Sequence, residues 1–541
     1  MPLDRPAQTA TPAVLRSVPG VAQVLTPEAL LFLADLQGRF GLRLHALMVA
    51  RSRRQSHYDD GRLPNYREET TDIRRGIWQI ESLPQALFDR RVEIAGPVDR
   101  KTMIAAFNSG ANVYVADFED MTSPSFGNII AGHANLLDHR DGALEIDGPA
   151  GLPQRLAANP AVLMVRPRGL HLHEANVLIS GQPVSAALFD FGLNAFHCGR
   201  ALAAIGQGPF YYLPKLESLE EARFWNEVFL YTQDQIGLPK GTIKATVLIE
   251  TLTAAFEMDE IIWELRDHIC GLNCGRWDYV FSYIKTLRNH AAYVLPDRDQ
   301  LAMDGGFLAT YGARVVKVGH RRGIHAIGGM TAHVPMSDDP ATDAADAAAM
   351  RQAREDQARE VHMGNDGTWV ATPEMVPIAK AVFDEEMRGH SQIRLPRQYF
   401  RIEPEMLLRP HKGQITEAGV RSNISVAIAY LAGWLSGRGA VPINNLMEDA
   451  STVEICRAQI WQWIRHSAEV QCDSGPRRLD ADWLGEMVQA EIVAVLDRLG
   501  PNGFHRGHYA SAARIFHEAV TAAQLPDFIT VQAYALLNAL D

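Results

Sequence analysis

The chain has few cysteines, no long apolar run and no excess of positive charge. Its 5 cysteines among 541 residues are an odd number without a CxxC pair, which argues against a disulfide framework and a zinc ribbon. The 52 basic and 64 acidic residues give a net charge of -12, so nothing attracts the chain generally to nucleic acid or an anionic membrane. No run of about 18 apolar residues occurs. We therefore expect neither a nucleic-acid partner nor a membrane-spanning segment.

Neither end of the chain shows a targeting signal. The first twenty residues contain prolines and an acidic residue where a secretory signal needs an unbroken apolar core, and the final Leu540 and Asp541 are not a peroxisomal signal. A composition of 47% hydrophobic and 21% charged residues is that of an ordinary globular protein. We expect a soluble, cytoplasmic protein.

Short β-rich runs, each followed by a helix-like segment, begin at about residue 90. Eight such runs alternating with helices predict an α/β fold, a (β/α)8 TIM barrel. The predicted strands are Val92 to Gly96, Val113 to Asp117, Val162 to Arg166, Tyr211 to Lys215, Ala245 to Glu250, Asp278 to Phe281, Ile324 to Gly329 and Trp369 to Ala371.

Helix-like spacing predominates on either side of this region. Residues 1–88 are predicted to form an N-terminal helical appendage, because apolar spacing from Pro27 to Ala34 is followed by a charged stretch. Residues 89–395 are the predicted barrel. Residues 396–541 are predicted to form a C-terminal helical domain with helices at 425–435, 451–464 and 484–499.

Several predicted strands end in polar residues. In a TIM barrel the chemistry takes place at the carboxyl ends of the strands, so these residues are candidates for a site. They are Asp117, Glu119 and Asp120 in VYVADFED, Arg166 in VLMVRPRG, Lys215 and Glu217 in YYLPKLE, and Glu250 in ATVLIE.

For each candidate the residues alone leave two interpretations open. Glu250 and Asp278, at the ends of neighbouring predicted strands, suit a hard cation, but they could equally cap helices or pair with basic groups. Arg166 suits an anionic ligand, or an ion pair with Asp117 or Glu119. Asp449 precedes a predicted helix, where aspartate is a preferred N-cap.

Six sequence blocks resemble one known family. The most specific is DHICGLNCGRWDYVFSYIK at 267–285. Five further blocks occur, and along the chain the blocks stand in the same order as in the family. The five are VRPRG at 165–169, YYLPKLE at 211–217, GTWVATP at 367–373, GQITEAGVRSNI at 413–424 and LMEDASTVEICRAQIWQW at 446–463. The chain thus resembles malate synthase of the short, bacterial A type. Thr372, where the family usually has histidine, and Asn365 depart from its pattern.

The resemblance implies an acyltransferase of the glyoxylate bypass, which feeds the tricarboxylic acid cycle. It would condense acetyl-CoA with glyoxylate and water to give malate and CoA, using one Mg2+. By resemblance Glu250 and Asp278 are the metal ligands. Arg166 would contact the glyoxylate and enolate oxygens, with Asp117 and Glu119 orienting it. Asp449 would be the catalytic base.

The resemblance also predicts the residues that bind the substrates. Gly275, Arg276 and Trp277, with Asp278 and Arg166, would bind glyoxylate, whereas Met330, Thr331 and Pro335 would contact CoA. The family further implies a monomer. Two alternatives remain: a malyl-CoA or citramalyl-CoA lyase, which would not hydrolyse the thioester, and a non-catalytic homologue that binds CoA esters or glyoxylate.

Overall fold

The computed structural model describes residues 11–148, 152–334, 343–395 and 401–541. Their central feature is a closed barrel of eight parallel strands, in the order β10, β11, β12, β13, β2, β3, β6, β9. The strands are β2 (Val92–Gly96), β3 (Val113–Asp117), β6 (Val162–Arg166), β9 (Phe210–Leu213), β10 (Lys244–Ile249), β11 (Ile269–Cys274), β12 (His325–Thr331) and β13 (Gly367–Val370). The predicted barrel is confirmed.

Seven of the eight predicted strands overlap observed ones, and the prediction of a strand at Asp278 to Phe281 is wrong. These residues lie in helix α10 (Arg276–Thr286), and the strand before it is β11. The aromatic run YVFSY has strong β propensity, whereas Gly271 and Asn273 weaken the signal of the true strand. Tertiary packing of α10, whose Tyr279 and Tyr283 are fully buried, overrides that local preference.

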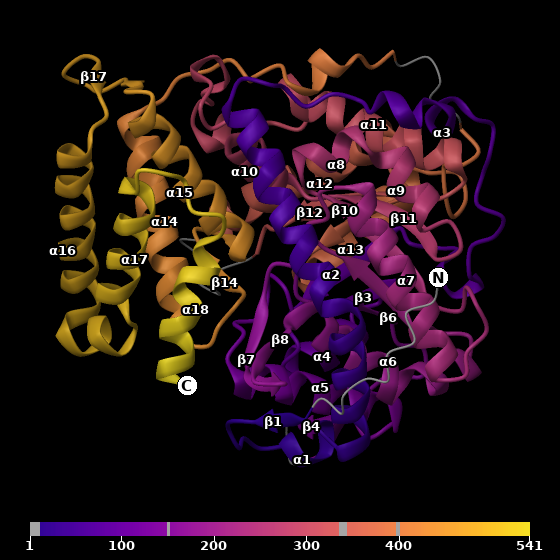
Figure 1. The fold of residues 1–541 in the computed structure, drawn as a ribbon. Coiled ribbons are helices and arrows are strands. Elements are labelled where there is room, and N and C mark those ends of the chain that lie inside the picture. Colours follow the sequence, from indigo (N-terminus) through magenta and orange to yellow (C-terminus); the bar gives the residue numbers. More distant parts are fainter. Residues whose placement is uncertain (1–10, 149–151, 335–342, 396–400) are drawn as a thin grey trace.

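Helices and short strands surround the barrel (Figure 1). The helices of this layer are α4 (Arg100–Phe107), α5 (Phe126–Arg140), α6 (Ala186–Ala204), α7 (Leu219–Gln235), α8 (Leu252–Phe256), α9 (Met258–Glu264), α11 (Gly306–Arg322), α12 (Asp343–Met363) and α13 (Val376–Glu386). β4 (Glu145–Asp147) and β5 (Pro153–Arg155) form a small antiparallel pair, and β7 (His173–Ile179) lies between β8 (Gln182–Ser185) and β1 (Pro12–Val14) in a three-stranded antiparallel sheet.

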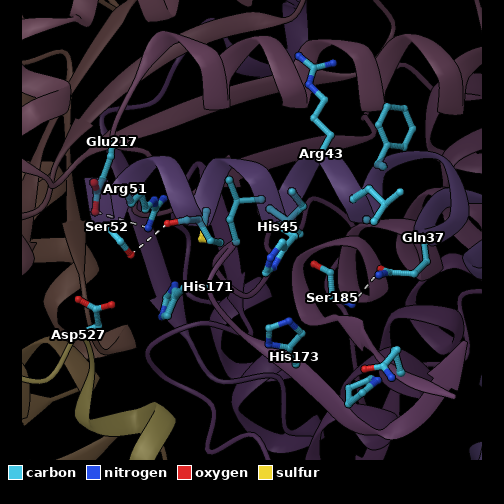
Figure 2. A pocket seen from close by; sticks show the side chains of 18 of the residues that line it. Gln37, Arg43, His45, Arg51, Ser52, His171, His173, Ser185, Glu217 and Asp527 are labelled. Carbon is cyan, nitrogen blue, oxygen red and sulfur yellow. Dashed lines mark hydrogen bonds and ion pairs between the residues drawn. The ribbon is translucent and has the colours of Figure 1, made fainter. Parts of the chain in front are cut away.

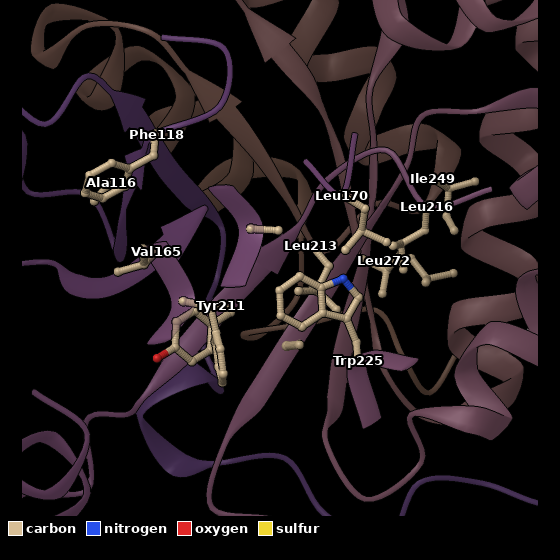
Figure 3. Packing of buried hydrophobic residues seen from close by; sticks show 14 of the residues in the cluster. Ala116, Phe118, Val165, Leu170, Tyr211, Leu213, Leu216, Trp225, Ile249 and Leu272 are labelled. Carbon is tan, nitrogen blue, oxygen red and sulfur yellow. The ribbon is translucent and has the colours of Figure 1, made fainter. Parts of the chain in front are cut away.

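The apolar core between strands and helices holds this layer in place. Figure 3 shows Tyr211 and Leu213 of the barrel wall near Trp225 of α7, with Val165 on the strand next to Tyr211. All four side chains are buried. Burying an aliphatic side chain stabilises the fold by roughly 1.5–3 kcal/mol, so the core fixes the wall from which the site residues project.

The N-terminal segment crosses the outside of the barrel. After β1 (Pro12–Val14) and α1 (Val21–Val24), the long helix α2 (Pro27–Asp59) begins at Thr26, whose hydroxyl caps it by accepting from Ala29 N at 3.2 Å. Helix α2 packs against α6 and α7. The short α3 (Thr71–Arg75) follows and contacts α9.

A separate group of helices follows the barrel and lies to one side of it in Figure 1. These are α14 (Glu417–Leu435), α15 (Ala450–Arg465), α16 (Ala481–Arg506), α17 (Tyr509–Thr521) and α18 (Ile529–Leu540), with short strand pairs β14 (Val441–Ile443) with β15 (Leu446–Glu448) and β16 (Glu469–Val470) with β17 (Arg477–Arg478). They enclose a second apolar core, and α15 packs on α10. The three predicted C-terminal helices are confirmed. Among the described residues, no helix is both long and apolar enough to span a membrane.

Candidate active site

A cavity of about 790 Å³ lies where the barrel mouth meets the start of α15. We call it the substrate cavity. Both the barrel and the C-terminal helices contribute to its wall, which includes Asp120, Arg166, Glu250, Asp278 and Asp449. The barrel residues lie at or just after the carboxyl ends of β3, β6, β10 and β11, so parallel strands bring side chains far apart in sequence to one place.

Arg166 ends β6 and is held by two carboxylates. Its Nε donates to Asp117 Oδ1 at 2.7 Å, its Nη2 also reaches that carboxylate, and its Nη1 lies 3.1 Å from Asp120 Oδ2. Burial alone would lower the pKa of Arg166, but the charges of Asp117 and Asp120 raise it well above its usual value. The predicted ion pair with Asp117 is therefore present, whereas Glu119 pairs with Lys215. The buried guanidinium keeps its charge and faces the cavity.

Asp117 organises the loop after β3. Its Oδ1 accepts from the backbone N–H groups of Glu119 at 2.9 Å and Asp120 at 3.3 Å, and its Oδ2 accepts from that of Met121 at 3.0 Å. One carboxylate thus fixes both the loop and Arg166. Hydrogen bonds to a charged group are worth about 1.5–3 kcal/mol each, so the loop is firmly placed.

Three buried carboxylates in the wall of the substrate cavity lie close together. Ligand oxygens of Asp120, Glu250 and Asp278 all lie within 4.8 Å of one another. Burial and the neighbouring negative charges raise the pKa of Asp278 well above its usual value, although Lys215 opposes this, and its Oδ1 is buried without a partner among the described residues. Oxygen donors this close, carrying excess negative charge, suit a hard divalent cation. The residues present therefore fit magnesium.

Lys215, one of the strand-end candidates, bridges the acidic residues, a role that the sequence does not assign to it. Its Nζ lies 2.8 Å from Asp120 Oδ1, 3.1 Å from Glu119 Oε1 and 3.3 Å from Asp278 Oδ2. Its backbone, at φ 54°, is in the left-handed region and its N–H donates to Glu250 Oε1 at 2.7 Å. Asp120 was also missed as a candidate ligand. Lys215 ends a predicted strand and Asp120 follows another, and this position is the signal that the sequence offers for both.

Asp449 caps helix α15 and faces the cavity as well. Its Oδ1 accepts from Ser451 N at 3.0 Å and from Ser451 Oγ at 2.5 Å. Burial, followed by the charge of Asp120, raises the pKa of Asp449 to about 7. Ala450 N also donates to the carbonyl of Asp120 at 3.2 Å, which ties the helix to the barrel loop. The cap interpretation is therefore correct, and it does not exclude a chemical role.

Gly275, Arg276 and Trp277 line the substrate cavity between β11 and α10. The Arg276 guanidinium lies 4.2 Å from the Trp277 ring centroid and donates to the carbonyl of Leu301. Burial lowers the pKa of Arg276 to about 10. At Gly275 a Cβ atom would lie 2.7 Å from Glu250 Cβ, so only glycine allows this approach.

The structure describes two of the three residues that are predicted to contact CoA. Met330 and Thr331 line the same cavity, whereas Pro335 lies outside the described residues.

Of the two departures from the family pattern, Asn365 donates from Nδ2 to Glu360, which lines the cavity. Thr372 precedes a short 3-10 helix, Pro373–Met375.

Comparison with known proteins identifies the family. Three family models match: malate synthase N-terminal domain over residues 11–72, malate synthase TIM barrel domain over 162–410 and malate synthase C-terminal over 414–537. The chain belongs to the malate synthase family. It is 48% identical to malate synthase of Myxococcus xanthus over 96% of this chain and 95% of the relative, and 44% identical to malate synthase A of Escherichia coli over 95% and 96%.

A solved structure, the Haloferax volcanii malate synthase magnesium/glyoxylate complex, is 14% identical over 78% of this chain and 98% of that one, with a TM-score of 0.42. So low a score supports no argument about the site. The sequence relatives confirm the predicted family and its activity, an acyltransferase that condenses acetyl-CoA with glyoxylate. Since the match to malate synthases is nearly full-length, the lyase and the non-catalytic homologue are not favoured.

Proposed function

We propose that the substrate cavity condenses the acetyl group of acetyl-CoA with glyoxylate and then hydrolyses malyl-CoA, giving malate and CoA. The observation that carries this proposal is the convergence of Arg166, three carboxylates and Asp449 on one cavity. A condensation of this kind needs a cation or a guanidinium to bind the aldehyde oxygen. It also needs a base to remove a proton from the methyl group, and a positive charge to stabilise the enolate. Each is supplied by a different element of the fold.

Glu250 and Asp278, joined by Asp120, would hold one magnesium ion. Bound magnesium supplies Lewis-acid polarisation of the glyoxylate carbonyl. Lys215 offsets part of the carboxylates' charge, because it contacts both Asp120 and Asp278. Asp117 and Glu119 would hold the basic groups of the site in place. Asp117 orients Arg166, and Glu119 pairs with Lys215.

Asp449 would remove a proton from the acetyl methyl group. A base whose pKa lies near the working pH combines basicity with a useful ionised fraction, and the pKa of Asp449 is about 7. The two hydrogen bonds from Ser451 occupy Oδ1 and leave Oδ2 for the methyl group. Arg166, across the same cavity, would stabilise the enolate oxygen as it forms.

Gly275, Arg276 and Trp277 are proposed to bind glyoxylate, and Met330, Thr331 and Pro335 to contact CoA. The position of all but Pro335 in the substrate cavity supports this assignment. The division of the chain near residues 88 and 395, the monomeric state and the cytoplasmic location stay predictions.

Release of the CoA thiol tests the proposal directly. We expect release from acetyl-CoA only when glyoxylate and magnesium are both present, with malate as the product. Cleavage of malyl-CoA to acetyl-CoA and glyoxylate without thiol release would instead indicate a lyase. Binding of both substrates without any turnover would indicate a non-catalytic homologue.

A further inference from the structure

Two further spaces lie on the side of the acidic residues that helix α2 covers. The larger one is an open cleft of about 2130 Å³ between α2, α7, α10 and the β7–β8 hairpin, which we call the α2 cleft. Figure 2 shows His171 and His173 in this cleft below α2, with Glu217 and Asp527 to one side. The cleft lies apart from the substrate cavity, and the mechanism proposed above makes no use of it.

A small cavity of about 20 Å³, which we call the rear cavity, adjoins the α2 cleft. The two share His171, His173 and Phe528 in their walls. The rear cavity also touches Asp120, which lines the substrate cavity, and Ala450, which follows Asp449. The rear cavity therefore has wall residues in common with both of the other spaces, three with the α2 cleft and Asp120 with the substrate cavity.

The rear cavity has the size and polarity of a site for one water molecule. A cavity of roughly 10–15 Å³ holds one water if two to four polar groups surround it. Glu119 and Lys215 line it, and so does His171, whose Nδ1 is buried without a partner among the described residues. Burial lowers the pKa of His171 well below its usual value, so the ring is neutral and one nitrogen can accept a hydrogen bond. Leu172 and Trp434 are among the apolar residues of its wall.

Hydrolysis of malyl-CoA needs a water molecule at a stage when the bound ligands fill the substrate cavity. Bound acetyl-CoA and glyoxylate displace water from the substrate cavity, and this protects the enolate from premature protonation. The thioester of malyl-CoA must nevertheless meet one water molecule afterwards. Water held in the rear cavity, beside the start of α15, meets both requirements. It stays out of the substrate cavity during condensation and is close by when the thioester is hydrolysed.

We propose that the rear cavity holds the water that hydrolyses malyl-CoA and is refilled from solvent through the α2 cleft. In this step the water oxygen bonds to the thioester carbonyl carbon and the carbon–sulfur bond breaks. The electron pair leaves on the CoA sulfur, which takes one proton of the water, and the new carboxyl group releases the other. This inference rests on the proposed condensation, because malyl-CoA is its product.

Thr530 offers a way to fill the rear cavity without touching the catalytic residues. It lines this cavity and lies in the first turn of α18. The larger side chain of Thr530→Leu fills the space, whereas Thr530→Val keeps the volume and is the matched control. His171→Phe is a second variant, since it keeps a ring to stack on Phe528, whose centroid is 3.9 Å away, and removes the nitrogen.

Single-turnover rapid quench measures acetyl-CoA consumption and malyl-CoA decay separately. We expect Thr530→Leu and His171→Phe to slow malyl-CoA decay by about tenfold or more, equivalent to 1.36 kcal/mol in the barrier, with unchanged condensation and a normal Thr530→Val protein. Unchanged decay in both variants, or equal slowing of both steps, would overturn the inference. If the wild-type protein forms no malyl-CoA or malate, the proposed function itself fails instead.

Discussion

Gly275→Ala tests whether close packing around Glu250 sets the affinity for magnesium. The substitution changes no charge, and the backbone φ of -107° at Gly275 is open to any residue. The new Cβ would lie 2.7 Å from Glu250 Cβ and 2.8 Å from Glu250 Oε2. Such overpacking costs about 1–3 kcal/mol, and it is relieved when the glutamate moves away.

The displaced carboxylate should bind the cation less well. Loss of a group that orients a metal ligand typically weakens metal affinity about 10–100-fold, and we expect a change of that size in Gly275→Ala. Calorimetric titration with magnesium gives the dissociation constant. Gly329→Ala is the control, because Gly329 lines the same cavity and its Cβ would meet nothing closer than 3.6 Å. Wild-type affinity in Gly275→Ala would refute the placement of Glu250 as a ligand.

Three further predictions concern other groups. Glu250→Gln and Asp278→Asn should each abolish turnover by removing an anionic oxygen ligand, and near-normal activity at low magnesium would count against that role. Arg166→Lys keeps the charge but loses the planar fork, so kcat should fall by roughly two orders of magnitude or more, while an active variant would make Arg166 structural. Burial alone would raise the pKa of Asp366, but hydrogen bonds with His320 and a backbone N–H lower it. Asp366→Asn should therefore be about 1–3 kcal/mol less stable at pH 7. The depressed pKa stabilises the fold only while Asp366 is ionised. The difference in the free energy of unfolding between the wild-type protein and Asp366→Asn, measured with urea, should therefore become smaller below about pH 4. A difference that does not change with pH would contradict this.

Strand ends were the most informative part of the sequence. Polar residues that close apolar runs, such as Arg166 and Glu250, lie in the site because a parallel barrel gathers its carboxyl ends on one face. The alternation of strands and helices therefore predicts both the fold and the end of the barrel at which the substrate cavity lies. The family resemblance then distinguished Arg166 and Glu250 from ordinary ion-paired residues.

Other features depend on contacts that a linear pattern does not encode. The aromatic run after Asp278 has the composition of a strand, but it lies in helix α10, whose tyrosines stack on α11 and which also packs against α15. The role of Lys215 arises from three carboxylates on different strands and loops, which no spacing could show. The same holds for Asp120, which becomes a candidate ligand only through its approach to Glu250 and Asp278.

The central claim, that Asp449 on the C-terminal helices acts on substrates held by the barrel, is tested most directly by Asp449→Asn. Asparagine is about as good an N-cap as aspartate, so the start of α15 should survive, whereas the amide cannot accept the methyl proton. We expect folding and magnesium-dependent glyoxylate binding to persist in calorimetry. Malate formation and exchange of the acetyl methyl protons with solvent, measured with a glyoxylate mimic bound, should both disappear. Retained turnover in this variant would contradict the account.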